Sequence, residues 1–360
     1  MPEQTQQTHQ TRERSGAPSG PDPAAESAEE LRTEWRRAAR LWAVVACFAV
    51  VGIARSIQVG VPFRDPEGAW LLSRVELTAG IFLGLVVVDV LLRSPSRRSW
   101  RALAATIRAR WTPTRLALVW CALLAYHVTY AVYRNLKSWD AFNTPRDAML
   151  TRWDSWLFLG HSPAVLLHDL LGQDVAARVL AIWYETFPYL VLVAFPAAVV
   201  LATRIKDAYA GIAALMWTWI LGTASYYAIP SLGPFNESPG DFAGLPPMSI
   251  QETQARYMAQ RGDFLAHPLA GDAFAQVSAF ASLHVGIAAA IVGLAWWHRL
   301  RRTTIVLTVF LAGTMVATVY LGWHFAVDVP AGLAIAALGW VLGPLTVGVR
   351  RRPEPRTGTL

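Results

Sequence analysis

The sequence is poor in charge, in cysteine and in lysine. Only 16% of the 360 residues are charged and 54% are hydrophobic, a balance too apolar for an ordinary soluble protein of this length. The two cysteines, Cys47 and Cys121, lie in separate apolar stretches, which argues against a disulfide framework or a zinc knuckle. The only lysines are Lys137 and Lys206, and this preference for arginine indicates a GC-rich genome and a bacterial source.

Residues 1–30 lack any apolar stretch and are rich in Gln, Thr, Pro and Ala. They have no apolar segment typical of a signal peptide and cannot form a core, so we expect them to be disordered. A short helix over residues 26–42 is expected to lead into the first span. Residues 1–38 are therefore predicted to be a cytoplasmic tail with a lead-in helix.

Long apolar segments make up most of the remaining chain. A membrane-spanning helix needs about 20 mostly apolar residues. Eight segments meet this requirement, namely residues 39–57, 70–92, 115–133, 177–203, 208–230, 277–298, 303–323 and 326–348. Residues 156–171 are too short and are interrupted by Pro163, so we expect an interfacial or re-entrant helix there.

These segments predict an all-α fold, a polytopic membrane helix bundle of about eight spans. Residues 39–114 are expected to form the first two spans with a basic cytoplasmic loop. Residues 115–348 would form the other six spans, and residues 349–360 a basic cytoplasmic tail.

Arginine clusters orient the predicted bundle. The net charge is +7, and the basic residues fall in short clusters between apolar segments, which fits membrane topology better than binding to nucleic acid. The clusters lie in alternate connections, around residues 32–40, 93–115, 204–206, 299–302 and 350–356. By the positive-inside rule we expect this side, with both termini, to be cytoplasmic in the plasma membrane, and the active site to face outside.

Two histidines and an aspartate are expected to meet at the outer face. His324 and Asp328 are four residues apart, so on a helix they share a face. His284 begins an apolar segment that leads to the basic cluster at 299–302, after which a second segment returns. Each leg has about 18 residues, or about 27 Å of helix, so this hairpin would bring His324 back to the depth of His284.

Such groups are costly inside a membrane, and their chemistry suits phosphoryl transfer. One imidazole can attack phosphorus, the other can protonate the leaving oxygen, and the carboxylate can orient the attacking ring. Ser282, close to the start of a helix, is placed to bind a phosphate oxygen. Two alternatives stay open: a polar network that ties helices together, or a bound metal ion, although no cysteine or further carboxylate lies at ligand spacing.

The stretches ASLH (281–284) and HFAVD (324–328) resemble the second and third motifs of the type 2 phosphatidic acid phosphatase superfamily. The likeness is greatest to the branch that includes inositol phosphorylceramide synthase, whose signatures are Ser-Leu-His and Gly-x-His-x-x-x-Asp. The stretch YYAIPSLGPF (226–235) and parts of residues 133–160 also resemble this branch. The resemblance covers about residues 115–348 and implies that the six spans there form a catalytic core, with the two spans of residues 39–114 as accessory spans.

This resemblance implies a role for each residue of the two motifs. His324 would be the nucleophile and His284 the general acid. Asp328 would orient His324, and Ser282 would bind phosphate oxygens. Neither a cofactor nor a metal ion is expected.

Several positions depart from the motifs of the superfamily. Tyr226 and Gly233 stand where its first motif has Lys and Arg, and Thr318 stands where its third motif usually has Arg. Because phosphoryl transfer depends on stabilising charge on the phosphate oxygens, other cations must replace them. We expect Arg134 to do so, with Tyr226 as a further phosphate-binding residue. Additional candidates are Lys137, Arg152, Arg256 and Arg261.

Three residues are possible members of the substrate site. Glu185 lies within an apolar segment, where a carboxylate marks either a site or a hydrogen-bonded structural group. Asp154 and Arg152 lie in the stretch RWDSW, which resembles the same branch and serves either the fold or the substrate.

The sequence therefore predicts a membrane-embedded phosphoric ester hydrolase or phosphotransferase that acts on a lipid phosphate at the outer leaflet through a phosphohistidine. We expect a phosphatase first. The alternatives are an inositol-phosphate-type transfer to a lipid alcohol, a lipid transporter and an inactive scaffold, but no internal repeat supports a transporter. The expected partners are the lipid substrate and the bilayer, without nucleic acid, and no oligomeric state is specified.

Overall fold

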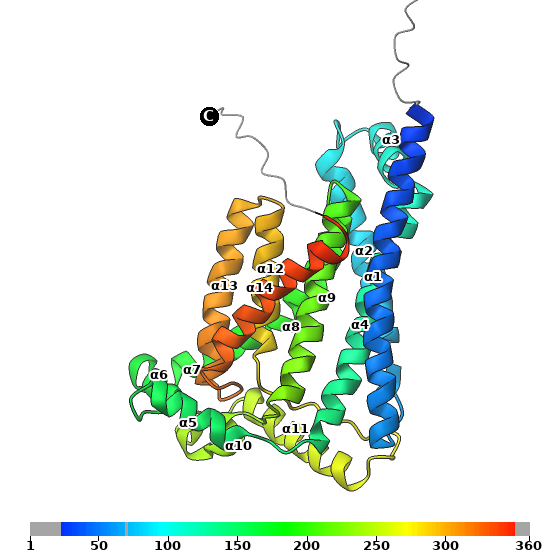
Figure 1. Cartoon of the computed structure of the whole chain (residues 1–360). Coiled ribbons are helices and arrows are strands. Elements are labelled where there is room, and N and C mark those ends of the chain that lie inside the picture. Colours follow the sequence, from blue (N-terminus) through cyan, green and yellow to red (C-terminus); the bar gives the residue numbers. More distant parts are fainter. Residues whose placement is uncertain (1–22, 69–70, 350–360) are drawn as a thin grey trace, which may run out of the picture.

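The computed structural model describes residues 23–68 and 71–349, and within these ranges it contains helices and no strands. The α-helices are α1 (Pro23–Val59), α2 (Leu72–Arg93), α3 (Trp100–Arg110), α4 (Pro113–Trp139), α5 (Asp147–Leu157), α6 (Pro163–Leu171), α7 (Val175–Glu185), α8 (Phe187–Val200), α9 (Ile205–Ala228), α10 (Pro234–Glu237), α11 (Ser249–Ala266), α12 (Leu283–Trp297), α13 (Arg301–Tyr320) and α14 (Asp328–Thr346). Short 3-10 helices are η1 (Pro66–Gly68), η2 (Asp140–Phe142) and η3 (Pro239–Phe242). The long helices lie side by side in a bundle, which confirms the predicted fold class (Figure 1).

Six helices in the described part of the chain are long and apolar enough to cross a membrane. They are Glu29–Val59, Leu72–Arg93, Pro113–Phe142, Val175–Val200, Arg301–Tyr320 and Asp328–Thr346. The other two predicted spans, 208–230 and 277–298, correspond to α9 and α12. Helix α12 has 15 residues and is therefore shorter than a full span, although it is apolar.

Two predicted spans differ from the structure in their continuity. The span over 177–203 is divided into α7 and α8, because Pro188 has no N–H to donate to the carbonyl of Tyr184. The span over 277–298 starts later than expected, since residues 273–281 are not helical and α12 begins at Leu283.

Serine side chains from other elements explain why residues 273–281 need no helical hydrogen bonds. The backbone N–H of Ala275 donates to Ser138 Oγ, and that of Ala281 donates to Ser225 Oγ. Because these backbone N–H groups have hydrogen-bond partners, the segment can stay non-helical until α12 begins.

Helix α9 lies at the centre of the bundle and packs against α4, α8, α12 and α14. Small residues permit this close packing. A Cβ atom added at Gly343 of α14 would lie 2.4 Å from the backbone nitrogen of Ala214, and one at Gly339 would lie 2.8 Å from the Ala214 carbonyl oxygen. Small residues at helix contacts are typical of membrane bundles, where backbones approach closely.

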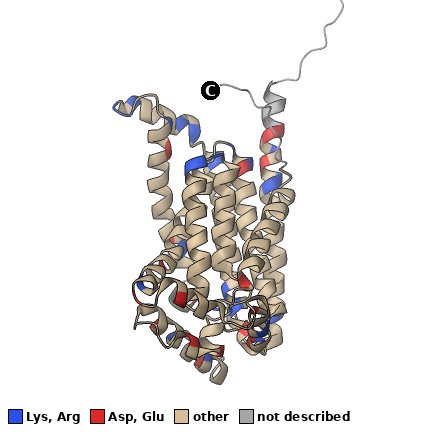
Figure 2. Cartoon of the chain, turned by 90° about the vertical axis from the view of Figure 1, so that its left-hand side faces the viewer, with Lys and Arg blue, Asp and Glu red and all other residues tan. Residues whose placement is uncertain are grey.

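Charged residues gather toward the two ends of the bundle, and its middle is almost free of them (Figure 2). One end, which we call the arginine-rich end, holds the start of α1, the helix α3 and the connections that precede α9 and α13 (Figure 1). The other end, which we call the loop end, holds α5, α6, α10 and α11 (Figure 1). The short helices α5 and α6 replace a ninth span, as predicted for residues 156–171.

The N-terminal prediction is partly wrong. The disorder predicted for residues 1–30 does not apply from Pro23 on, because α1 is helical from there, and the lead-in helix continues into the first span without interruption. The remainder of that prediction, residues 1–22, lies outside the described residues, as does the C-terminal tail from residue 350.

Candidate active site

The loop between α13 and α14 presents His324. Gly322 adopts φ +78° at the end of α13, and the N–H of His324 donates to the carbonyl of Thr318 at 3.1 Å. The Asp154 carboxylate of α5 then accepts the N–H groups of Ala326 and Val327 at 2.7 and 2.9 Å. The segment that carries His324 is therefore fixed from both sides.

Asp328, His324 and His284 form a chain of polar contacts. His324 Nδ1 lies 3.2 Å from Asp328 Oδ2, and His324 Nε2 lies 3.5 Å from His284 Nδ1. The side chain of Asp328 is fully buried, and that of His324 is almost so. The hairpin of α12 and α13 thus brings the two histidines together, as the spacing along the sequence predicted.

Tyr184 of α7 completes this arrangement. Its hydroxyl lies 3.1 Å from His284 Nδ1, and its ring stacks on that of His284 with centroids 4.4 Å apart. The interruption between α7 and α8 follows directly after this residue pair, Tyr184 and Glu185. His284 is therefore held by contacts with a tyrosine and with the second histidine.

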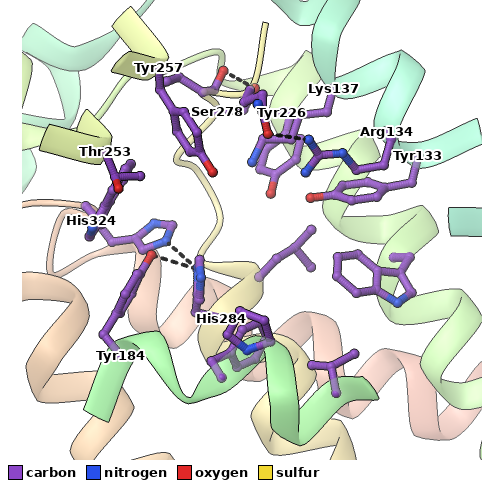
Figure 3. A pocket seen from close by; sticks show the side chains of 18 of the residues that line it. Tyr133, Arg134, Lys137, Tyr184, Tyr226, Thr253, Tyr257, Ser278, His284 and His324 are labelled. Atoms are coloured by element: carbon purple, nitrogen blue, oxygen red, sulfur yellow. Dashed lines mark hydrogen bonds between the residues drawn. The ribbon is translucent and has the colours of Figure 1, made fainter. Parts of the chain in front are cut away.

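A cavity of about 350 Å³ opens onto both histidines. Its polar lining includes the cations Arg74, Arg134 and Lys137 and the tyrosines Tyr130, Tyr133, Tyr184, Tyr226 and Tyr257. Figure 3 shows His324, His284 and Tyr184 on one side of this cavity and Tyr133, Arg134, Lys137 and Tyr226 on the other. We call it the histidine cavity.

The helix α4 places two cations in this cavity on one face. Arg134 and Lys137 are three residues apart, so their side chains share a side of the helix. Arg134 Nη2 donates to Gln276 Oε1 at 2.7 Å, and Lys137 Nζ lies 5.5 Å from the centroid of the Tyr226 ring. This arrangement can bind an anion that also touches the histidines.

A comparison with family models identifies the chain. The model of the PAP2 superfamily matches residues 148–342, a little over half of the sequence. The chain belongs to the PAP2 superfamily. Members of this superfamily are phosphatases and phosphotransferases, so the chemistry expected in general is that of phosphoric esters. No curated protein and no solved structure matches the chain.

The PAP2 match confirms the superfamily predicted from the two histidine motifs. It includes His284, His324 and Asp328, whereas α4 and its cations precede it. One position that departs from the superfamily's motifs has a structural role here. Gly233 adopts φ +110°, and a Cβ atom there would lie 2.7 Å from the carbonyl oxygen of Trp323. An arginine could not occupy this position without moving that backbone.

The structure distributes the other predicted site residues between the cavity and its surroundings. Tyr226 and Arg134 line the histidine cavity. Glu185 lines it as well, and its carboxylate accepts the hydroxyl of Ser249 at 2.6 Å. Arg152 is exposed and does not line it.

Ser282 does not line the histidine cavity. It is fully buried and is the N-cap of α12, where its Oγ accepts the N–H of Val285 at 3.4 Å. Its own N–H donates to the carbonyl of Asp328 at 3.2 Å. In this structure Ser282 therefore joins the two helices that carry His284 and Asp328.

Asp154 contacts the loop that carries His324 from outside the histidine cavity. It lines a second, smaller cavity of about 200 Å³ that also reaches His324. Burial is the main cause that raises the pKa of Asp154 to about 6, and the hydrogen bonds from Ala326 and Val327 act in the opposite direction. Burial likewise raises the pKa of Asp147, whose carboxylate accepts the N–H of Gly233 at 2.9 Å.

Sequence reasoning missed two residues of the site. Tyr184 precedes Glu185 in an apolar stretch, and only the interruption at Pro188 signals that this part of the span is unusual. Arg74 lies in a span that was predicted to be accessory, and no pattern in the sequence around it linked it to the histidines.

The residue types around the cavity do not form a metal site. Within residues 23–68 and 71–349, no group of three or more His, Cys, Asp or Glu side chains is placed to hold a metal ion. The ligands for a phosphate would instead be Arg134, Lys137 and the tyrosine hydroxyls that face them.

Proposed function

We propose that this PAP2 protein is an integral-membrane enzyme that removes or transfers a phosphoryl group of a lipid through a phosphohistidine on His324. The observation that carries the proposal is the chain from Asp328 through His324 to His284, which ends in a cavity lined by cations. Coupled imidazoles next to preorganised positive charge are what phosphoryl transfer requires.

In the first step, His324 attacks phosphorus. Its Nδ1–H donates to Asp328, which leaves the lone pair of Nε2 free to form the N–P bond. The bond between phosphorus and the leaving oxygen breaks, and His284 donates its Nδ1 proton to that oxygen. Asp328 stabilises the positive charge that develops on the ring of His324.

In the second step, the phosphohistidine is cleaved. His284, now neutral at Nδ1, accepts a proton from water as the water oxygen attacks phosphorus. The N–P bond breaks, and inorganic phosphate and neutral His324 are released. If the hydroxyl of an alcohol replaces water, the same step transfers the phosphoryl group, so one site supports either reaction.

Arg134 and Lys137 supply the charge that the superfamily's motif residues would otherwise provide. Charge on the three phosphoryl oxygens rises in the transition state, and fixed cations in a site that excludes water stabilise it strongly. Both side chains project from α4 into the cavity, on the side opposite the histidines (Figure 3). A phosphoryl group in between is held from both sides.

The substrate is proposed to come from the outer leaflet. The histidine cavity is lined by residues of α11, the end of α4 and the start of α12, which lie toward the loop end, and the arginine clusters mark the other end. The positive-inside rule assigns that arginine-rich end to the cytoplasm of the cell, with both termini, in the plasma membrane. The long apolar helices α1, α2, α4, α13 and α14 support a multi-pass membrane location.

The test is a substrate screen with the purified protein in detergent. Lipid monophosphates, lipid diphosphates and phosphodiesters are offered with and without an alcohol acceptor, and both phosphate release and the product lipid are measured. We expect phosphate release from at least one lipid phosphate, with water as the acceptor. A phosphate ester of the added alcohol would instead assign a phosphotransferase, and no turnover of any lipid would refute an enzyme.

A further inference from the structure

Arg74 of α2 lines the histidine cavity although α2 lies outside the region that matches the PAP2 superfamily. Its guanidinium carbon lies 4.2 Å from the centroid of the Tyr130 ring on α4, a close cation–π contact. One turn further along α2, the hydroxyl of Thr78 lies 3.1 Å from His127 Nε2, and both side chains are buried. This buried contact fixes α2 against α4, so Arg74 is held at the cavity wall.

The charge around the cavity is unbalanced. Its charged lining residues, apart from the histidines, are Arg74, Arg134, Lys137 and Glu185. Across residues 23–68 and 71–349, no ion pair joins Arg74 to a carboxylate, and Glu185 is hydrogen bonded to Ser249 instead. Three cations that face one carboxylate favour an anionic ligand.

The cations are spread along α4 rather than gathered at one point. Tyr130, which holds Arg74, precedes Arg134 by four residues and Lys137 by seven, which corresponds to about 6 and about 10 Å along the helix axis. Arg134 reaches the other way, toward Gln276 in the non-helical segment before α12. Arg74 and Arg134 are therefore held by different neighbours, Tyr130 and Gln276, so each can bind a different anionic group of one ligand.

The size of the cavity agrees with a larger ligand. Its volume of about 350 Å³ corresponds to roughly 12 water molecules at about 30 Å³ each. A phosphoryl group consists of one phosphorus and three oxygen atoms, so the cavity has room for a second polar group of the lipid headgroup.

We propose that α2 is part of the substrate site and that Arg74 binds a second anionic group of the lipid, separate from the phosphoryl group that is transferred. This rests on the proposed function. The transferred group lies between His324 and the pair Arg134 and Lys137. Arg74 is held at Tyr130, one helical turn before Arg134 along α4, so it meets the anionic group that stays on the lipid. The preferred substrate is a lipid that carries two phosphate groups.

The test compares three lipids with the same acyl chains. Phosphatidic acid carries one phosphate, diacylglycerol diphosphate carries two in direct linkage, and phosphatidylglycerol phosphate carries two across a glycerol. The highest kcat/KM of the wild type should be for one of the two lipids that carry two phosphates. The preferred lipid identifies the spacing between the two phosphate groups that the site accepts. Arg74→Gln should lower kcat/KM for that lipid at least tenfold more than for phosphatidic acid, mainly through KM, because Arg74 does not touch the transferred group.

Two further variants make this test decisive. Arg178→Gln removes a charge from an exposed side chain of α7 that pairs with Asp174, and it should change kcat/KM for neither kind of lipid. Arg74→Lys keeps the charge, so its loss of kcat/KM should be smaller than that of Arg74→Gln. It also replaces Arg74→Gln in the comparison if that variant is too unstable to measure. An equal loss on one-phosphate and two-phosphate lipids, or a wild type that prefers phosphatidic acid, would overturn the role of Arg74. If no lipid phosphate is cleaved at all, the proposed function fails instead.

Discussion

His284 and His324 lie next to each other but need opposite protonation states in the proposed first step. His324 must be neutral to attack, and His284 must carry a proton to donate. Of the two imidazoles, Asp328 contacts that of His324, while Tyr184 contacts that of His284. The structure thus gives each imidazole its own partner, and the two should fail differently when they are replaced.

The first prediction concerns the leaving group. His284→Ala should retain much of its activity toward p-nitrophenyl phosphate, because a phenolate leaves without a proton. The same variant should lose activity toward an alkyl lipid phosphate by at least two orders of magnitude, in the range typical of general acid catalysis. Steady-state kinetics on the two substrates measures this ratio. Equal losses on both would assign His284 to phosphate binding or to the fold.

The second prediction concerns pH and Asp154. Burial raises the pKa of this carboxyl to about 6 from its ordinary value of 3.8, so the folded protein binds this proton more tightly than the unfolded chain. Its contribution to stability is therefore present below about pH 4 and is lost as the pH rises through about 6. The apparent Tm of the wild type should fall over this window by more than that of Asp154→Asn, which cannot ionise. If Tm depends on pH in the same way in the wild type and in Asp154→Asn, the raised pKa of Asp154 is contradicted.

At the scale of elements, the contact between α12 and α14 sets the distance between the histidines. The Ser282 N–H donates to the Asp328 carbonyl, and Gly332 lies directly against the same turn. A Cβ atom at Gly332 would lie 2.4 Å from the carbonyl oxygen of Ser282, which is backbone and cannot rotate away. The start of α14, with Asp328, must therefore move if this glycine gains a side chain.

The third prediction follows from this contact. Gly332→Ala should lower kcat and destabilise the protein by about 1–3 kcal/mol, the usual cost of overpacking. Gly84→Ala in α2 is the matched control, because nothing lies within 4 Å of its added Cβ and a helical alanine is favoured over glycine. Thermal unfolding in detergent and kcat are measured for both. Wild-type kcat in Gly332→Ala would show that this contact does not position the site.

The elements also show how much the sequence could predict. The hairpin between His284 and His324 was predictable, because helix rise and apolar segment length fix where a returning helix ends. The start of α12 was not, since residues 273–281 are apolar yet are held by Ser138 and Ser225, which lie far away in the sequence. Arg74 reaches the site only through the packing of α2 on α4, which leaves no pattern in the sequence.

At the scale of the whole molecule, the proposed function requires that the loop end faces outward. The fourth prediction uses single cysteines in a background in which Cys47 and Cys121 are replaced by Ser. Asp272→Cys at the loop end should react with a membrane-impermeant maleimide in intact cells, and Ser96→Cys between α2 and α3 only after lysis. Both positions are exposed. Labelling of Ser96→Cys alone in intact cells would invert the orientation and place the chemistry in the cytoplasm.

The central claim is that His324 carries the phosphoryl group, and trapping the phosphoenzyme tests it most directly. Purified protein is mixed with radiolabelled lipid phosphate, quenched within milliseconds and analysed for protein-bound phosphate that is stable to alkali and labile to acid. We expect such a species in the wild type, located on the peptide that contains His324, and none in His324→Ala. A phosphoenzyme of the same lability in His324→Ala, or turnover by that variant, would contradict it.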